Sequence, residues 1–98
     1  MKLEQALITL RKAEIALRAK GVQHAAIFGS TARGEAHAES DVDVLIDFDP
    51  SASVTVYDYV AIRNDIASLF DGRVDVVDRE GLKPHLRRPV TQDLVYAF

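Results

Sequence analysis

Leucines and alanines recur at helical spacing through the first twenty residues, with charged side chains at most of the intervening positions. This periodicity is typical of an amphipathic helix with one face on a core. Gly21 follows the last turn and favours a helix end there. The pattern therefore predicts one packing helix that begins at Leu3 and stops at Gly21, with an apolar face formed by Leu3, Ala6, Leu7, Leu10, Ala13 and Leu17.

Three shorter apolar runs have the length and composition of strands, namely Val22 to Phe28, Val42 to Phe48 and Val74 to Val77. Between the second and third runs, the helical pattern returns from about Thr55 to Phe70. The predicted apolar stripe of this second helix consists of Val56, Tyr59, Val60, Ile62, Ile66 and Leu69. A crossover through this helix predicts parallel strands on either side of it, with a right-handed connection.

The end of the chain is apolar. The pattern turns helical again after Pro84, and Pro89 is placed to open a last segment that contains Val90, Leu94, Val95, Tyr96 and Phe98. This segment either covers the core or forms a surface for a partner. We expect it to pack on the sheet, because so short a chain needs most of its apolar side chains to stay folded.

These elements together predict an α/β fold, a small mixed sheet of three to four strands with helices packed on it. At 98 residues, the chain is expected to form a single domain spanning residues 1–98.

The candidate chemistry lies where the first two strands meet. Gly29-Ser30 ends the first strand, and after a ten-residue spacer Asp41-Val42-Asp43 opens the second. Because side chains alternate along a strand, Asp41 and Asp43 are expected on one face, about 6 to 7 Å apart at the backbone. Two carboxylates this close repel each other, and hard oxygen ligands of this kind suit Mg²⁺. The two strands are expected to run antiparallel, since this brings the glycine turn to the carboxylates.

The turn itself suits a phosphate. Gly29 allows close approach of the backbone, and Ser30 offers a hydroxyl beside the freed N–H groups of the following turn. A third carboxylate usually completes a two-metal site. Asp75 and Asp78 lie on opposite faces of the third strand, so at most one of them joins, and Asp75 is favoured.

Each piece also has a plain structural interpretation. Gly-Ser often forms only a turn, and aspartates at the start of a strand often cap it. The combination indicates more, because Asp43 lies inside an apolar run where an uncompensated carboxylate is costly.

The segments GSTARGEA, SDVDVLIDF and GRVDVVDREGLKP resemble the minimal nucleotidyltransferases of the DNA polymerase beta superfamily, specifically the MntA-like antitoxins of HEPN/MNT toxin–antitoxin pairs. The resemblance covers nearly the whole chain. It implies the minimal polymerase-beta-type fold, with ATP and Mg²⁺ as cosubstrates. The implied activity is AMP transfer to a tyrosine hydroxyl of a cognate HEPN ribonuclease, which silences that toxin in a hetero-oligomeric complex.

The resemblance also implies roles for single residues. Gly29 and Ser30 would hold the triphosphate, Asp41 and Asp43 would bind Mg²⁺, and Asp75 would complete the catalytic and metal site and help to deprotonate the acceptor hydroxyl. Arg33 matches the motif as well. Its guanidinium either binds phosphate oxygens or pairs with Glu35 or Asp41 to order the loop.

Other reactive side chains are weaker candidates. The basic cluster Lys83, His85, Arg87 and Arg88 is either a solvated helix end or a contact to phosphates or to an acidic partner surface. The histidines His24, His37 and His85 lack the spacing of metal ligands. Tyr57, Tyr59 and Tyr96 are possible sites of automodification, although packing explains them more simply.

Composition narrows the function classes. The net charge of −3 argues against a general nucleic-acid surface, which depends on a positive field. No apolar run approaches the roughly 20 residues of a membrane span, no apolar signal core opens the chain, and it has no cysteine. A cytoplasmic protein is the expectation.

Three functions remain open at this point: an antitoxin that adenylylates its partner, a non-catalytic antitoxin that acts by binding alone, and a nucleotidyltransferase for a small hydroxylated molecule. The retention of all three carboxylates favours an enzyme over the second. The absence of room for an acceptor domain argues against the third.

Overall fold

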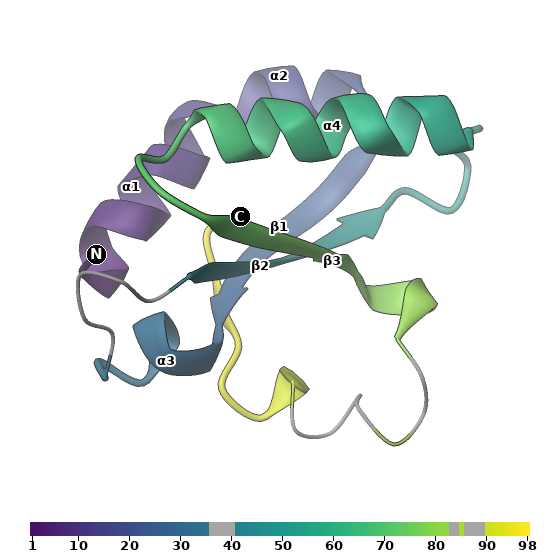
Figure 1. Cartoon of the computed structure of the whole chain (residues 1–98). Coiled ribbons are helices and arrows are strands. Elements are labelled where there is room, and N and C mark those ends of the chain that lie inside the picture. Colours follow the sequence, from purple (N-terminus) through teal and green to yellow (C-terminus); the bar gives the residue numbers. More distant parts are fainter. Residues whose placement is uncertain (36–40, 83–84, 86–89) are drawn as a thin grey trace.

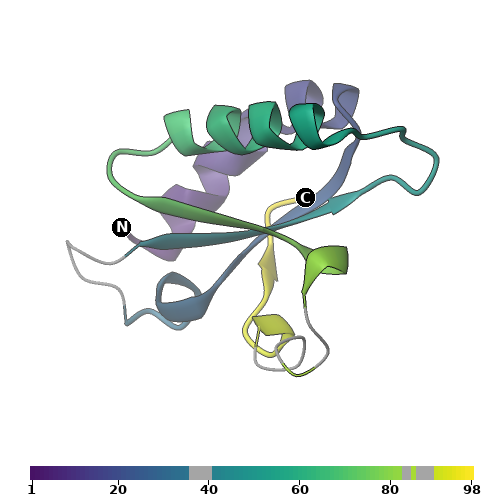
Figure 2. The same ribbon diagram turned by 45° about the vertical axis from the view of Figure 1, so that its right-hand side comes forward.

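The computed structural model describes residues 1–35, 41–82, 85 and 90–98. Its elements in chain order are α1 (Leu3–Lys12), α2 (Glu14–Ala19), β1 (Val22–Phe28), α3 (Gly29–Ala32), β2 (Val42–Phe48), α4 (Val56–Ser68), β3 (Val74–Asp78), the 3₁₀ helix η1 (Arg79–Gly81) and β4 (Val95–Tyr96). Helices α1, α2 and α4 lie on one face of the sheet, and α3 and η1 lie toward the other (Figures 1 and 2).

The strands form one mixed sheet in the order β3-β2-β1-β4. β1 and β2 are antiparallel, with Phe28 opposite Asp43, as expected from the sequence. β2 and β3 are parallel, with Asp43 opposite Asp75. The α/β fold, the three predicted strands and both predicted pairings are therefore confirmed, and β4 supplies a fourth strand.

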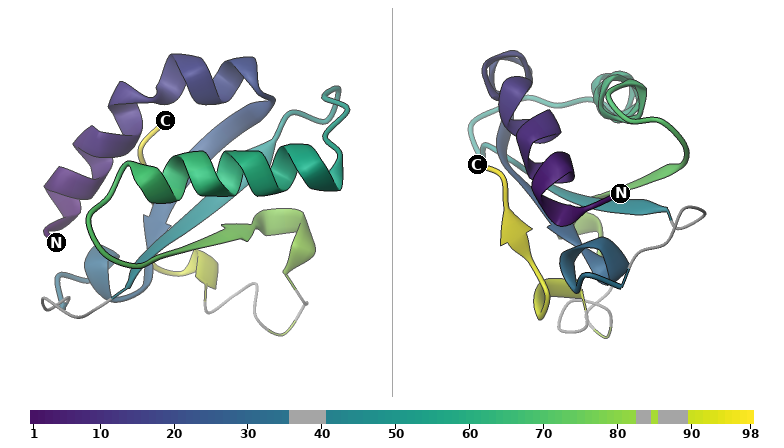
Figure 3. Two further views of the ribbon diagram at one scale, coloured as in Figure 1. Left: turned by 45° about the horizontal axis from the view of Figure 1, so that its top comes forward. Right: turned by 90° about the vertical axis from the view of Figure 1, so that its left-hand side faces the viewer.

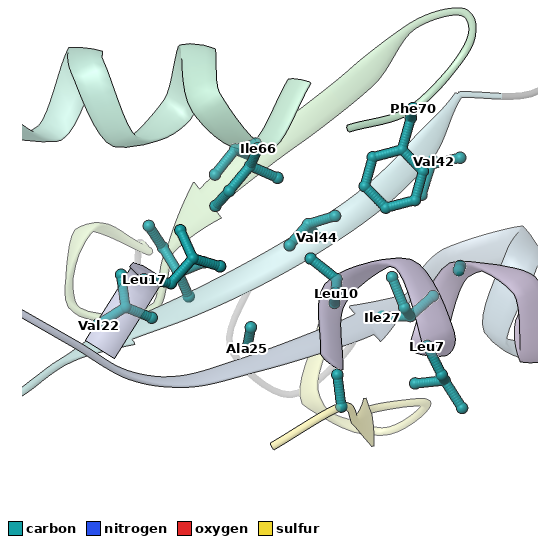
Figure 4. Packing of buried hydrophobic residues seen from close by; sticks show 14 of the residues in the cluster. Leu7, Leu10, Leu17, Val22, Ala25, Ile27, Val42, Val44, Ile66 and Phe70 are labelled. Atoms are coloured by element: carbon teal, nitrogen blue, oxygen red, sulfur yellow. The ribbon is translucent and has the colours of Figure 1, made fainter. Parts of the chain in front are cut away.

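The core lies between the sheet and the helices. The first two helices contribute Leu7, Leu10 and Leu17 to this core, and β2 contributes Val42, Val44 and Ile46. On the side of α4, the same cluster includes Ile62, Ile66 and Phe70 (Figure 4). Alternate residues of β2 point into this core, so Asp43 and Asp47 are directed to the opposite face. The apolar residues thus fix which face of the sheet carries the acidic side chains.

The prediction of one N-terminal helix was wrong, because the helix is interrupted at Ala13. The Ala13 N–H bonds to the carbonyl of Leu10, three residues back, and its backbone leaves the helical region. No glycine or proline marks this position. The two resulting helices follow different directions over β1 (Figure 3), and both place leucines in the core.

The predicted stripe of α4 was only partly correct. Ile62 and Ile66 are buried and Tyr59 packs against the core, but Val56, Val60 and Leu69 are exposed. The side chains of Val56 and Val60 lie well away from the Ile62 and Ile66 direction at 100° per residue, and Leu69 follows the last helical turn. Phe70, just beyond the helix, is buried instead.

The chain end packs on the sheet, as expected. β4 pairs with β1, and the N–H of Ala97 bonds to the carbonyl of Ala25 at 2.8 Å. Arg11 of α1 donates to the carbonyl of Ala97 at 2.9 Å. The helix predicted after Pro84, and Lys83, Arg87 and Arg88 of the basic cluster, lie outside the described residues.

Candidate functional site

The centre of the site is the contact between the glycine turn and the second strand. Gly29 begins α3 directly after β1, with φ +73°, a conformation that favours glycine. A Cβ atom added there would overlap Oδ2 of Asp43 and would lie 3.2 Å from its Cγ. The absence of a side chain at Gly29 therefore allows the Asp43 carboxylate to sit directly against the turn.

Asp43 lies against this turn, and Asp75 and Asp41 are the two further candidate carboxylates. Asp43 is half-buried on β2, and Asp75 is its register partner on β3, exposed to solvent. Asp41 immediately precedes β2 and is exposed. Burial, then Asp75, then Asp41 raise the pKa of Asp43, while Arg33 lowers it. Asp75 and Asp41 therefore both act electrostatically on Asp43.

The acidic set fits a divalent cation in its chemistry. A cation among these oxygens would relieve the repulsion that raises the pKa of Asp43, and hard carboxylate oxygens suit Mg²⁺. The three carboxylates do not form a complete metal site in this arrangement, because among the described residues no three His, Cys, Asp or Glu side chains are grouped closely enough to hold a metal ion. Asp41 is instead paired with Arg73, with Oδ1 to Nε at 3.4 Å. Asp41 would have to turn from Arg73 to join the other two.

Asp78, the alternative third carboxylate, has a structural task. It lies at the end of β3, three residues from Asp75, and its Oδ1 accepts the N–H of Glu80 at 3.1 Å. This bond caps η1. The structure thus places Asp75, and not Asp78, beside Asp43.

Arg33 follows α3 and is held by two carboxylates. Its Nε donates to Glu35 at 3.0 Å, and its Nη1 donates to Asp93 at 3.1 Å. These bonds raise the pKa of Arg33, with Glu35 the larger cause and Asp93 the next. Of the two carboxylates considered from the sequence, Glu35 pairs with Arg33, whereas Asp41 pairs with Arg73. Asp93 was missed, because no sequence signal connects two residues sixty positions apart.

The structure also reveals a buried hydroxyl in the turn. Thr31 of α3 is 1% exposed, and its Oγ1 has no hydrogen-bond partner among the described residues. Nothing in the sequence distinguishes this threonine from an ordinary helix residue.

The remaining candidates lie elsewhere or have other partners. Tyr59 donates its hydroxyl to the carbonyl of Val76 at 3.3 Å, and Tyr96 accepts a hydrogen bond from Arg79 at 2.5 Å. Tyr57 is 86% exposed on α4. His24 stacks edge-on against Tyr96, and His85 is exposed. His37 lies outside the described residues.

A hollow of ≈ 560 Å³ is found at the opposite ends of the strands, around Gly21, Ala52 and Val54. Its lining includes none of the three carboxylates, so it does not contribute to this site. Within the described part of the chain, no helix has the length and apolar character needed to cross a membrane.

Comparison with known proteins agrees with this geometry. Residues 10–97 match the nucleotidyltransferase domain family. The protein adenylyltransferase MntA of Thermococcus cleftensis is 34% identical over 94% of this chain and 90% of its own length. A solved minimal nucleotidyltransferase is 36% identical with a TM-score of 0.74, covering 97% of this chain and 95% of that one.

Two solved toxin–antitoxin complexes share the fold. One, crystallised with AMP-PNP, has a TM-score of 0.70 at 23% identity over 90% of this chain and 72% of its own. The other is the tri-AMPylated HEPN toxin of Shewanella oneidensis with its MNT antitoxin, with a TM-score of 0.60 at 19% identity over 91% and 70%. The fold, the glycine turn with its facing carboxylates and the matches over nearly the full length lead to one conclusion: this chain belongs to the nucleotidyltransferase domain family, as a minimal nucleotidyltransferase of the polymerase beta superfamily related to the MntA-like adenylyltransferases.

Proposed function

We propose that this chain is an antitoxin that transfers AMP from ATP to a tyrosine hydroxyl of a cognate HEPN ribonuclease and thereby neutralises it. The single observation that carries the proposal is the position of the Asp43 carboxylate directly against Gly29, with Asp75 opposite Asp43 on the neighbouring strand. The names of the relatives support the reaction class: one is a protein adenylyltransferase, and another is an antitoxin bound to an AMPylated HEPN toxin.

In this reaction, the tyrosine oxygen attacks the α-phosphorus of ATP. The bond from that phosphorus to the bridging oxygen of the β-phosphate breaks, and pyrophosphate leaves. Such chemistry needs clamped phosphates and compensation of developing charge more than covalent help from protein. Mg²⁺, when bound, would supply that compensation. Gly29 and Ser30 would seat the triphosphate, and AMP-PNP in a related complex supports ATP as the donor.

The carboxylates would divide the remaining work. Asp41, Asp43 and Asp75 would hold the cation, and Asp75, the exposed member nearest the edge of the sheet, would help to take the proton of the acceptor hydroxyl. Arg33 would meet the phosphate oxygens, exchanging one of its two carboxylate partners for them.

The test is the transfer of label from α-labelled ATP, with Mg²⁺, to the protein encoded by the neighbouring gene, which on this proposal is the cognate HEPN ribonuclease. We expect the original chain to label the partner and Asp43→Asn to lose the transfer by about a hundredfold or more. Glu4→Gln, a neutralised carboxylate on the exposed side of α1, serves as control and should transfer normally.

The outcome separates the alternatives. If Asp43→Asn suppresses toxicity as well as the original does, and neither protein transfers label, the antitoxin acts by binding alone. Transfer of label to a small hydroxylated compound, with none to the HEPN protein, would identify the third function.

A further inference from the structure

An apolar groove lies between the N-terminal end of α4 and η1. These two ends lie on the side of the molecule opposite to α3 (Figure 1). It has a volume of ≈ 390 Å³ and continues into a hollow of ≈ 330 Å³ that shares Tyr59 and Asp78 as lining. We call the two together the α4–η1 groove. Its apolar wall is formed by Phe48, Pro50, Ala52, Val54, Val56 and Tyr59.

One residue of this wall is exposed, and an exposed tyrosine lies next to it in sequence. Val56 is 77% exposed and Tyr57, the next residue, is 86% exposed. Neither belongs to the core, although the sequence pattern places Val56 on the apolar stripe. Exposed valine and tyrosine beside an apolar hollow are typical of a protein-binding surface.

The rim of the groove carries one sign of charge. Asp49, Asp78 and Glu80 line it, and among the described residues no lysine, arginine or histidine does. Arg79 is adjacent in sequence, but its guanidinium is directed to Asp47 at 3.5 Å and to the hydroxyl of Tyr96. Arg63 acts on Tyr59 from one turn further along α4 without lining the groove. The negative charge of this rim is therefore complementary to a positively charged segment of a partner.

The groove also lies on a path to the carboxylates. β3 is an edge strand of the described sheet, and it runs from Asp75 beside Asp43 to Asp78 on the rim. These two aspartates are three residues apart, about 10 Å along a strand. The side chains of these two aspartates lie on opposite faces of the edge strand. A protein in the groove therefore has to extend around this edge to reach the candidate site, which is within the width of an ordinary interface.

We propose that the α4–η1 groove is the docking surface for a basic amphipathic segment of the protein acceptor, which here, resting on the proposed function, is the HEPN ribonuclease. The apolar side of the segment covers Val56 and Tyr59, and its lysines or arginines face Asp49, Asp78 and Glu80. A ribonuclease needs positive charge to hold RNA, so a surface of this sign is available on such a partner.

The experiment measures the dissociation constant between the purified full-length chain and its cognate HEPN ribonuclease, at low and at physiological salt. The groove variant is Glu80→Lys with Val56→Lys, both at exposed positions. The matched control is Glu4→Lys with Ile15→Lys, an equal charge change and an equally exposed aliphatic residue on α1 and α2. Circular dichroism melts check that both variants are folded.

We expect the groove variant to bind at least about tenfold more weakly, with a smaller salt dependence, and the control to stay within about twofold of the original. An unchanged dissociation constant of the groove variant overturns the proposal, as does an equal loss in the control.

Label transfer from α-labelled ATP, measured on the same samples, separates this proposal from the proposed function. If the original chain transfers label normally and the groove variant keeps its dissociation constant, the docking proposal is wrong and the proposed function stands. If the groove variant binds more weakly but the partner is never labelled, even by the original chain, the proposed adenylyl transfer is wrong and the docking surface stands. The absence of any complex with the original chain overturns both.

Discussion

The carboxylate of Asp43 occupies the space that a side chain at position 29 would fill. Gly29 directly follows β1, and Asp43 lies opposite Phe28 on β2. The antiparallel register therefore brings a turn at the end of one strand into contact with an acidic residue inside the next. Gly29 thus has two reasons to be glycine, its positive φ and the oxygen atom beside it.

Gly29→Ala separates these two reasons. We expect a loss of roughly 1–3 kcal/mol in the free energy of unfolding from the positive φ, and a fall of about a hundredfold or more in AMP transfer because Asp43 must move. Gly72→Ala is the control, since Gly72 has φ +93° with no atom within 4 Å of an added Cβ. It should lose stability similarly in denaturant melts while keeping its transfer rate. Equal activities of the two variants would contradict the role given to the contact.

Asp43→Asn should stabilise the metal-free protein at neutral pH. The raised pKa of Asp43 means that the folded state disfavours its charge, and this cost is fully present above the folded pKa. The cost disappears as the pH falls through the folded pKa toward the unfolded value of 3.8. The gain in melting temperature of the variant should therefore shrink on acidification to below pH 4. A gain that is independent of pH would show that the cause is not electrostatic.

Mg²⁺ should raise the melting temperature of the original chain in the absence of nucleotide. At ten times its dissociation constant, a cation bound only by the folded state adds about 1.4 kcal/mol. Asp43→Asn should lose this increase, because the cation then has one acidic ligand fewer. The measurement is a thermal melt over a MgCl₂ titration at constant ionic strength. An equal increase in both proteins would place the ion elsewhere.

Thr31→Val should stabilise the fold by about 1 kcal/mol, because it replaces a buried hydroxyl that lacks a described partner with a methyl group of the same shape. For a domain of this length, the expected rise in melting temperature is about 4–8 °C. Thr9→Val is the matched control: Thr9 is partly exposed, and its hydroxyl already donates to the carbonyl of Gln5 at 2.8 Å. A destabilised Thr31→Val would indicate a partner for this hydroxyl.

Asp58→Ala should destabilise the protein at neutral pH but much less in acid. The carboxylate accepts the N–H of Thr55 at 3.0 Å in the capping box of α4, and this bond is the main cause that lowers the pKa of Asp58. Its contribution is present above the unfolded pKa of 3.8 and is lost as the pH falls through the lower folded value. Urea melts at pH 7 and pH 3 measure the difference, with Asp71→Ala, just beyond α4, as control. A deficit that persists unchanged at pH 3 would contradict this account.

Several features were predictable because they depend on local pattern. The two strands that bring Gly29 and Asp43 together are marked by predominantly apolar runs, and their bounds agree with the structure. The parallel placement of Asp75 beside Asp43 followed from the handedness of a strand–helix–strand crossover. These relationships involve either neighbours in sequence or a chirality that every chain of L-amino acids shares.

Other features depend on which distant surfaces meet. Ala13 interrupts the first helix without a sequence signal, and the exposure of Val56 and Val60 follows from the way α4 is rotated on the sheet. The partners of the two arginines at the site, Asp93 for Arg33 and Asp41 for Arg73, come from segments far apart in the chain.

The sequence by itself determined the strands, the glycine turn and the acidic spacing, because alternation and turn chemistry are properties of adjacent residues. Only the tertiary structure decided the seat of Asp43 against Gly29, the partners of the arginines and the acidic rim of the α4–η1 groove. Contacts of that kind depend on register, helix rotation and long-range packing, which the periodicity of a single segment does not encode.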